Sequence, residues 1–132
     1  MKKISIYLLL TLVLISCNSD DDAGNDNVIG KWKLIGQLVD PGDGSGVFQP
    51  VFSNLTLHFL QTGNVTATNG SFCSIYTQPE GSRSGTFSLD TNTIETECTN
   101  GKITISFEIK DGNLILYFPC IEGCAQKYSR TF

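Results

Sequence analysis

From residue 28 onward, apolar and polar residues alternate in short runs that are separated by clusters of Gly, Asn and Asp. The clearest run is Ile103-Thr-Ile-Ser-Phe-Glu-Ile109, where every second residue is apolar, as in a strand with one buried face. No window shows the 3.6-residue period of an amphipathic helix. The pattern predicts strands at residues 31–39, 53–60, 63–69, 72–77, 83–89, 93–99, 102–110, 113–119 and 126–132.

Short turn signals join neighbouring predicted strands. Asp111-Gly112 is a strong two-residue hairpin signal, and similar turn chemistry lies at residues 61–64, 90–92 and 99–101. Connections this short predict an all-β, up-and-down antiparallel meander. Eight or nine strands remove their exposed edges most simply by closing into a small barrel, although periodicity alone leaves a two-sheet sandwich open.

The alternation also divides side chains between the interior and the outer face. Those predicted to point outward include Ile35, Val39, Leu60, Ile115 and Tyr117. Those predicted to point inward are Trp32, Leu34, Leu55, Leu57, Phe59, Phe87, Leu89, Ile94, Ile103, Ile105, Phe107, Ile109, Leu114, Leu116, Phe118, Tyr128 and Phe132. Because the interior of an eight-stranded barrel is just wide enough for side chains, this bulky set predicts a mostly filled barrel.

The N-terminus has a different pattern. Met1-Lys2-Lys3 is basic and residues 4–15 are almost wholly apolar, which is typical of a secretory signal and too short for a membrane-spanning helix of about 20 residues. The run ends in Leu14-Ile-Ser-Cys17, which resembles the lipobox of bacterial lipoproteins. The resemblance implies a signal peptide at residues 1–16 and a mature chain that begins at Cys17, whose thiol carries a diacylglycerol.

Composition limits the mature chain to one domain, because removal of residues 1–16 leaves 116 residues. The full chain has 9 basic and 13 acidic residues, and loss of Lys2 and Lys3 leaves 7 against 13, a net charge of −6. Without a basic stripe to neutralise phosphates, nucleic acid is not an expected partner. We therefore divide the mature chain into the lipidated Cys17 with a flexible acidic tether at residues 17–27 and a barrel domain at residues 28–132.

The acidic run in the tether, which includes Asp20, Asp21 and Asp22, also bears on location. It resembles the export signal that sends lipoproteins to the outer cell surface in Bacteroidetes. We expect a lipid-anchored protein of the outer membrane displayed on the cell surface, with a periplasm-facing anchor as the alternative.

Four cysteines remain once Cys17 is lipidated: Cys73, Cys98, Cys120 and Cys124. An even number in an exported domain favours two disulfides. Zinc is less favoured, because Cys73 and Cys98 have no close second ligand, so no metal site is predicted. We expect the pairs Cys73–Cys98 and Cys120–Cys124, although three pairings are possible and the sequence does not choose among them.

Gly30-Lys-Trp32 in the first predicted strand and Tyr128-Ser-Arg130 in the last resemble the lipocalin, or calycin, pattern. The layout of residues 28–132 is similar to the small lipocalin-like domains of Bacteroidetes lipoproteins. The resemblance implies that Arg130 packs across the indole of Trp32 and closes the bottom of a barrel. A guanidinium stacks well on an indole face, so the pair is expected to be structural, with a ligand-stacking platform as the alternative.

The longest glycine-rich loop, Asp40-Pro-Gly-Asp43-Gly-Ser-Gly46, joins the first two predicted strands. It lacks the alternating Asp/Asn spacing of a calcium loop, which favours a mobile entrance loop. In lipocalin-like barrels the first long loop covers the open end, and the resemblance therefore implies a ligand-binding mouth lined by Val47, Phe48 and Val51.

His58, the only histidine, follows a predicted inward residue and so faces solvent. No serine-hydrolase elbow, zinc-protease motif or phosphate loop accompanies it, and we expect neither enzyme activity nor a cofactor. The expected function is non-catalytic binding of a small apolar ligand near the membrane. The alternative is a cell-surface accessory module that binds protein or glycan with its loops and outer face.

Overall fold

The computed structural model of the 132-residue chain describes residues 27–75, 81 and 83–132. In this part all regular structure is β-strand. The strands are β1 (Gly30–Val39), β2 (Gln49–Pro50), β3 (Thr56–Phe59), β4 (Asn64–Thr68), β5 (Ser84–Ser88), β6 (Thr93–Cys98), β7 (Gly101–Lys110), β8 (Asn113–Phe118) and β9 (Cys124–Thr131).

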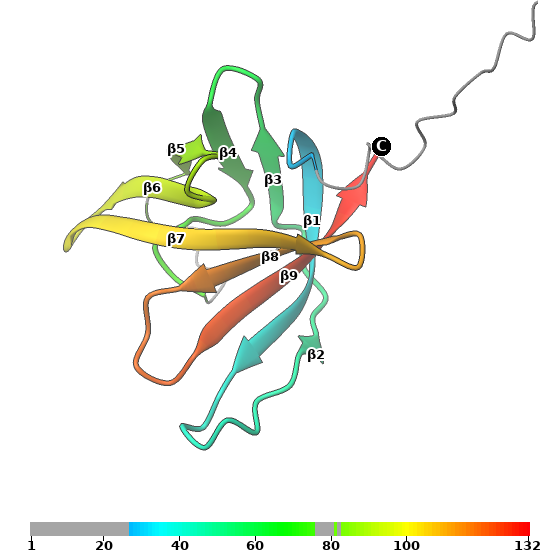
Figure 1. The fold of residues 1–132 in the computed structure, drawn as a ribbon, viewed down its shortest axis with the longest axis vertical. Coiled ribbons are helices and arrows are strands. Elements are labelled where there is room, and N and C mark those ends of the chain that lie inside the picture. The colour runs from blue at the N-terminus through cyan, green and yellow to red at the C-terminus, as the bar shows by residue number, and fades with distance from the viewer. Residues whose placement is uncertain (1–26, 76–80, 82) are drawn as a thin grey trace, which may run out of the picture.

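The strands form one antiparallel meander that closes on itself (Figure 1). Each strand from β3 to β8 pairs with the next along the chain, and β1 pairs with both β3 and β9. Eight strands therefore make a closed barrel, and β2 is an additional strand on the same side of β1 as β3. This confirms the predicted barrel rather than a sandwich. Asp111 and Gly112 both have positive φ, as the predicted tight hairpin requires.

Two strand boundaries differ from the prediction. Residues 72–75 form no strand, and the remainder of the predicted strand, residues 76–77, lies outside the described residues. Phe72 and Ile75, three residues apart, instead reach into the core from a connection whose backbone joins no ladder. The short β2 was missed because Gln49-Pro50 carries no apolar alternation; its proline lies at a sheet margin, where a missing donor is tolerated.

The meander places alternate connections at opposite ends of the barrel. The closed end holds the start of β1, the connections β3–β4, β5–β6 and β7–β8, and the end of β9. The open end holds the connections β1–β2, β4–β5, β6–β7 and β8–β9. Asn27, where the description begins, lies at the closed end near the C-terminus (Figure 1).

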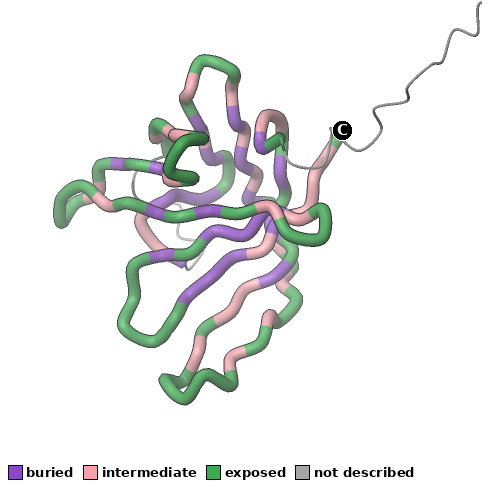
Figure 2. The backbone as a smooth tube through the Cα atoms, viewed as in Figure 1, coloured by how far each residue is buried: buried purple, intermediate pink, exposed green. Residues whose placement is uncertain are grey.

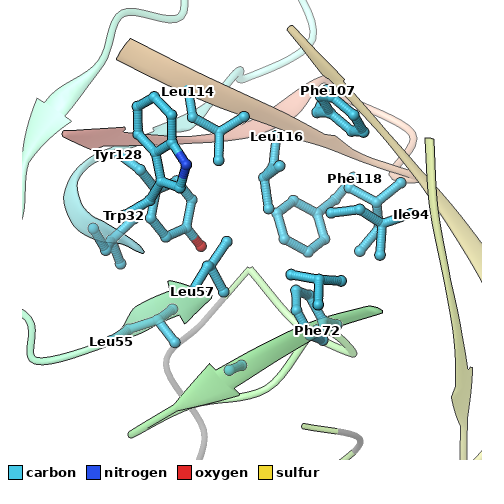
Figure 3. Close-up of a cluster of buried hydrophobic side chains, with 14 of the residues drawn as sticks. Trp32, Leu55, Leu57, Phe72, Ile94, Phe107, Leu114, Leu116, Phe118 and Tyr128 are labelled. Atoms are coloured by element: carbon cyan, nitrogen blue, oxygen red, sulfur yellow. The ribbon is translucent and has the colours of Figure 1, made fainter. Parts of the chain in front are cut away.

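Most buried residues lie on the strands, whereas the connections are largely exposed (Figure 2). Phe72, from the β4–β5 connection, inserts among wall residues such as Leu57, Ile94 and Phe118 (Figure 3). Nearer the closed end, Phe59 makes edge-on contacts with Phe87 and Phe107, at centroid distances of 5.1 and 5.8 Å. The prediction of a mostly filled interior is therefore confirmed.

The predicted inward set is wrong at Leu89 and Phe132, which are exposed because both lie beyond the ends of their strands. Phe87, Ile103 and Ile109 are partly buried and pack against the core, as predicted. Conversely, Ile115 was predicted to be an exposed outward residue but is 5% exposed. It stands between Glu108 and Lys127 in the strand register, and long side chains of this kind cover apolar neighbours.

The predicted signal peptide, lipidated Cys17 and nearly all of the acidic tether lie outside the described residues. All nine strands, both disulfides and the hydrophobic core belong to residues 28–132. This stretch therefore contains a complete closed barrel with its own core, and we expect it to fold without the N-terminal segment.

Candidate functional site

Arg130 and Trp32 meet at the closed end as predicted. They are paired across β1 and β9, and the guanidinium carbon lies 4.3 Å from the centre of the Trp32 ring. Nη1 of Arg130 donates a 2.8 Å hydrogen bond to the Ile29 carbonyl, and Nη2 donates to the Asn27 carbonyl. The Trp32 indole N–H donates to the carbonyl of buried Val28 at 2.7 Å. The two side chains therefore hold residues 27–29 across the closed end of the barrel.

This arrangement supports a structural role for the pair. Trp32 is fully buried, and its face is covered by the guanidinium, so no indole surface is open to a ligand. A Cβ on Gly30 would lie 3.1 Å from Nη1 of Arg130, and Gly30 has φ +125°, a conformation that favours glycine. The glycine in Gly30-Lys-Trp32 thus allows the chain to turn beneath the guanidinium.

A buried polar chain holds the β4–β5 connection inside the barrel. Nε2 of Gln126 donates a 2.7 Å hydrogen bond to the Ile75 carbonyl, and Nε2 of Gln37 donates to the same oxygen. The Tyr128 hydroxyl donates to Oε1 of Gln126 at 2.6 Å, and burial raises the pKa of this phenol well above its usual value. We call residues 70–75 the plug, since this network and Phe72 fix the segment in the interior.

Both predicted disulfides are present, and both lie at the open end. Cys73 in the plug is joined to Cys98 at the end of β6, 25 residues along the chain. Cys120 and Cys124 pin the turn between β8 and β9. These bonds also occupy the four cysteines that a zinc site would have used.

The glycine-rich loop after β1 folds around the carboxylate of Asp40. Oδ1 accepts hydrogen bonds from the N–H groups of Gly42 and Gly44 at 2.7 and 3.0 Å, and Oδ2 accepts one from Gly46 at 2.8 Å. These N–H groups, that of Gly46 most of all, lower the pKa of Asp40 below its usual value. The Asp40 N–H in turn donates to the Gly123 carbonyl at 3.0 Å, which ties this loop to the β8–β9 turn. The carboxylate organises the loop backbone; the predicted mobility of the loop stays a prediction.

The three residues predicted to line the mouth are placed differently. Val47 and Val51 border a shallow groove of about 420 Å³ beneath the loop. Phe48 does not: its ring lies on the outer face near Gly36, with Nζ of Lys127 4.6 Å from the ring centre. A bulge in β1 between Leu34 and Gly36 turns Gly36 outward beside Lys127, and this creates the outer position that Phe48 covers.

The larger depression at the open end lies between the plug and the β8–β9 turn. It has a volume of about 570 Å³, is open to solvent, and is bordered by both disulfides. Its apolar lining is contributed by Val39, Ile75, Ile103, Phe118, Pro119 and Ile121. We call it the open-end depression.

One charged side chain, Glu122, is found among the described residues that line the open-end depression. Within the described part of the chain it makes no ion pair; the cation–carboxylate contact that the structure does show joins Lys102 to Glu95 at 2.6 Å. The depression therefore combines apolar walls with one exposed carboxylate that makes no ion pair in the described part of the chain.

His58 lies on β3, half-buried, opposite Lys31 and Thr66 in the register. No hydrogen bond or ion pair links it to a carboxylate within the described residues. The same part of the chain contains no group of three His, Cys, Asp or Glu residues placed to hold a metal ion.

On the outer face, the Tyr117 hydroxyl donates a hydrogen bond to Glu108 at 2.6 Å. This hydrogen bond is the main cause that raises the pKa of Tyr117 to about 12.

Sequence reasoning did not identify Ile75, Ile103, Phe118, Ile121 and Glu122 as neighbours. One signal was available: Pro119-Cys120 and Cys124 mark a pinned turn, and Ile121 is an apolar residue placed within it. The other wall, provided by Ile75, depends on the path of the plug and has no local signature.

No known protein family, curated protein or solved structure matches this chain. Across the described residues, no helix has the length and apolar character needed to cross a membrane.

Proposed function

We propose that this chain is a lipid-anchored lipoprotein of the outer membrane whose lipocalin-like barrel binds a small apolar ligand without catalysis. The anchor rests on the lipobox-like Leu14-Ile-Ser-Cys17, and surface display rests on the acidic residues that follow. The lipocalin resemblance rests on Gly30-Lys-Trp32 and Arg130, and their packing at the closed end is consistent with it.

The open-end depression carries the binding proposal. Its volume of about 570 Å³ lies within the range of roughly 300–1,000 Å³ that is usual for small-molecule sites, and its walls are mainly apolar. The packed interior argues against a ligand deep in the barrel. Binding is therefore proposed at the mouth, where Ile121 is 103% exposed and available for contact.

Lipidation is tested by growing a bacterial host with an alkyne-tagged palmitate. The full chain should incorporate the label and sediment with membranes, whereas Cys17→Ser should lose both properties. A chain that sediments and takes up label equally well with Cys17→Ser would overturn the anchor.

Ligand binding is tested on residues 18–132 with N-phenyl-1-naphthylamine, an uncharged apolar fluorophore. We expect saturable fluorescence that Ile121→Asp weakens at least fivefold, since a new charge disfavours apolar contact at the mouth. Phe52→Asp is the matched control, because Phe52 is equally exposed but lies on the β2–β3 connection. Absence of saturable binding would reject the proposal.

The second candidate is a surface module that binds protein or glycan. The exposed Phe52 favours it, because that ring lies beside a shallow side groove lined by Pro50, Val51 and neighbouring residues of β1. In the same fluorescence experiment this candidate predicts little binding by the parent protein and no distinction between the two variants.

A further inference from the structure

We propose that the ligand of the open-end depression is an amphiphile with an apolar body and a cationic head. This inference rests on the proposed function, because it names the ligand class of the same site. Two features of the structure carry it: the apolar lining of the depression and the charges around it.

The depression offers apolar contact on most sides and a negative charge at one point. Ile103 and Phe118 come from β7 and β8, and Ile121 comes from the pinned turn. Beside them Glu122 supplies an exposed carboxylate without a cationic partner in the described part of the chain. An apolar chain with a positive head satisfies both features, whereas an anionic head meets like charge.

The neighbouring loop adds negative charge on the same side. A Cβ built on Gly42 would lie 3.8 Å from Oε1 of Glu122, so the glycine-rich loop passes close to this carboxylate. That loop carries Asp40 and Asp43, and the backbone N–H groups around Asp40 keep it ionised. Three carboxylates therefore occur on this part of the rim.

The described cations at this end are engaged or lie elsewhere. Lys102 pairs with Glu95 at 2.6 Å. Lys127 lies over the Phe48 ring on the outer face. Arg83 immediately precedes β5 and is not one of the described residues that line the depression. The uneven charge around the rim thus favours a cationic group near Glu122.

The experiment compares three ligands that share one apolar chain. Decyltrimethylammonium, decanol and decyl sulfate are titrated into residues 18–132 by calorimetry, each below its micelle concentration and at low salt. We expect the cationic ligand to bind roughly tenfold more tightly than the anionic one. The Glu122 carboxylate attracts the cationic head and repels the anionic head, and each of these surface interactions changes the dissociation constant severalfold. The difference should shrink in about 0.5 M salt through screening.

Glu122→Gln should remove most of this preference while leaving decanol binding unchanged. Asp90→Asn is the matched control, because it removes one exposed negative charge at the closed end and alters the net charge equally. Equal affinity for the three ligands, a preference for decyl sulfate, or equal effects of the two variants would overturn the inference and leave the proposed function standing. If decanol and the cationic ligand both fail to bind, the proposed function itself fails.

Discussion

The two ends of the barrel are sealed by different kinds of interaction. At the closed end, Arg130 and Trp32 join the first and last strands and bind the carbonyls of residues 27–29. At the open end, two disulfides and hydrogen bonds to Asp40 hold the connections, and an apolar depression remains open. The closed end is completed by the strands themselves, whereas the shape of the open end depends on its connections. We expect substitutions at the closed end and in the plug to affect stability most, and substitutions around the open-end depression to affect ligand recognition most.

The largest expected effect on stability comes from truncating Phe72, the plug residue whose side chain fills the barrel interior. Phe72→Ala should lower the free energy of unfolding by about 3–5 kcal/mol, the usual cost of truncating a buried phenylalanine. Urea denaturation measures it, and Phe52→Ala, at an exposed phenylalanine, should cost less than about 0.5 kcal/mol. Equal losses in the two variants would show that Phe72 does not fill the interior.

The two disulfides should differ in their contributions. Cys73→Ser with Cys98→Ser should cost about 3 kcal/mol, and Cys120→Ser with Cys124→Ser about 2 kcal/mol, because the second pair closes a loop of only a few residues. Thermal denaturation of the two double variants compares them. A larger loss from the second pair would mean that the turn, not the plug, controls the stability of the open end.

At the closed end, Arg130→Lys should cost about 1–2 kcal/mol, because lysine keeps the charge but loses the planar stacking and the paired donation. Lys110→Ala, at an exposed residue of the same end, is the control and should be nearly neutral. Near-ultraviolet circular dichroism of Trp32, the only tryptophan, reports the local change alongside urea denaturation. If the lysine variant equals the parent in both measurements, the Arg130 guanidinium does not stabilise the closed end.

The smallest expected effect is the pH response of the glycine-rich loop. Asp40 has a folded-state pKa below the ordinary 3.8, so its hydrogen bonds stabilise the protein above that value and are lost as the pH falls through the folded pKa. The amide proton of Gly46 should therefore shift in NMR spectra only below about pH 4. Asp40→Asn should abolish that titration, and a Gly46 shift centred above pH 4 would contradict the arrangement.

Prediction from the sequence was most successful where the signal is local. Alternation in residues 103–109 and the Asp111-Gly112 turn correctly located the β7–β8 hairpin. It failed for Leu89 and Phe132, because alternation does not show where a strand ends and exposure begins. It also failed for Phe48, because the bulge in β1 shifts the register and moves that ring to the outer face.

The sequence alone therefore determined the all-β meander, its tight turns and the means of forming two disulfides, since each depends on neighbouring residues or on cysteine number. Only the tertiary structure decided that the plug fills the barrel and that Ile121 and Glu122 line the same depression as Ile75 of the plug. The Ile75 carbonyl meets Gln126 across 51 residues, and Arg130 reaches Ile29 across 101. Contacts this distant depend on barrel closure and strand register, which no local pattern of residues specifies.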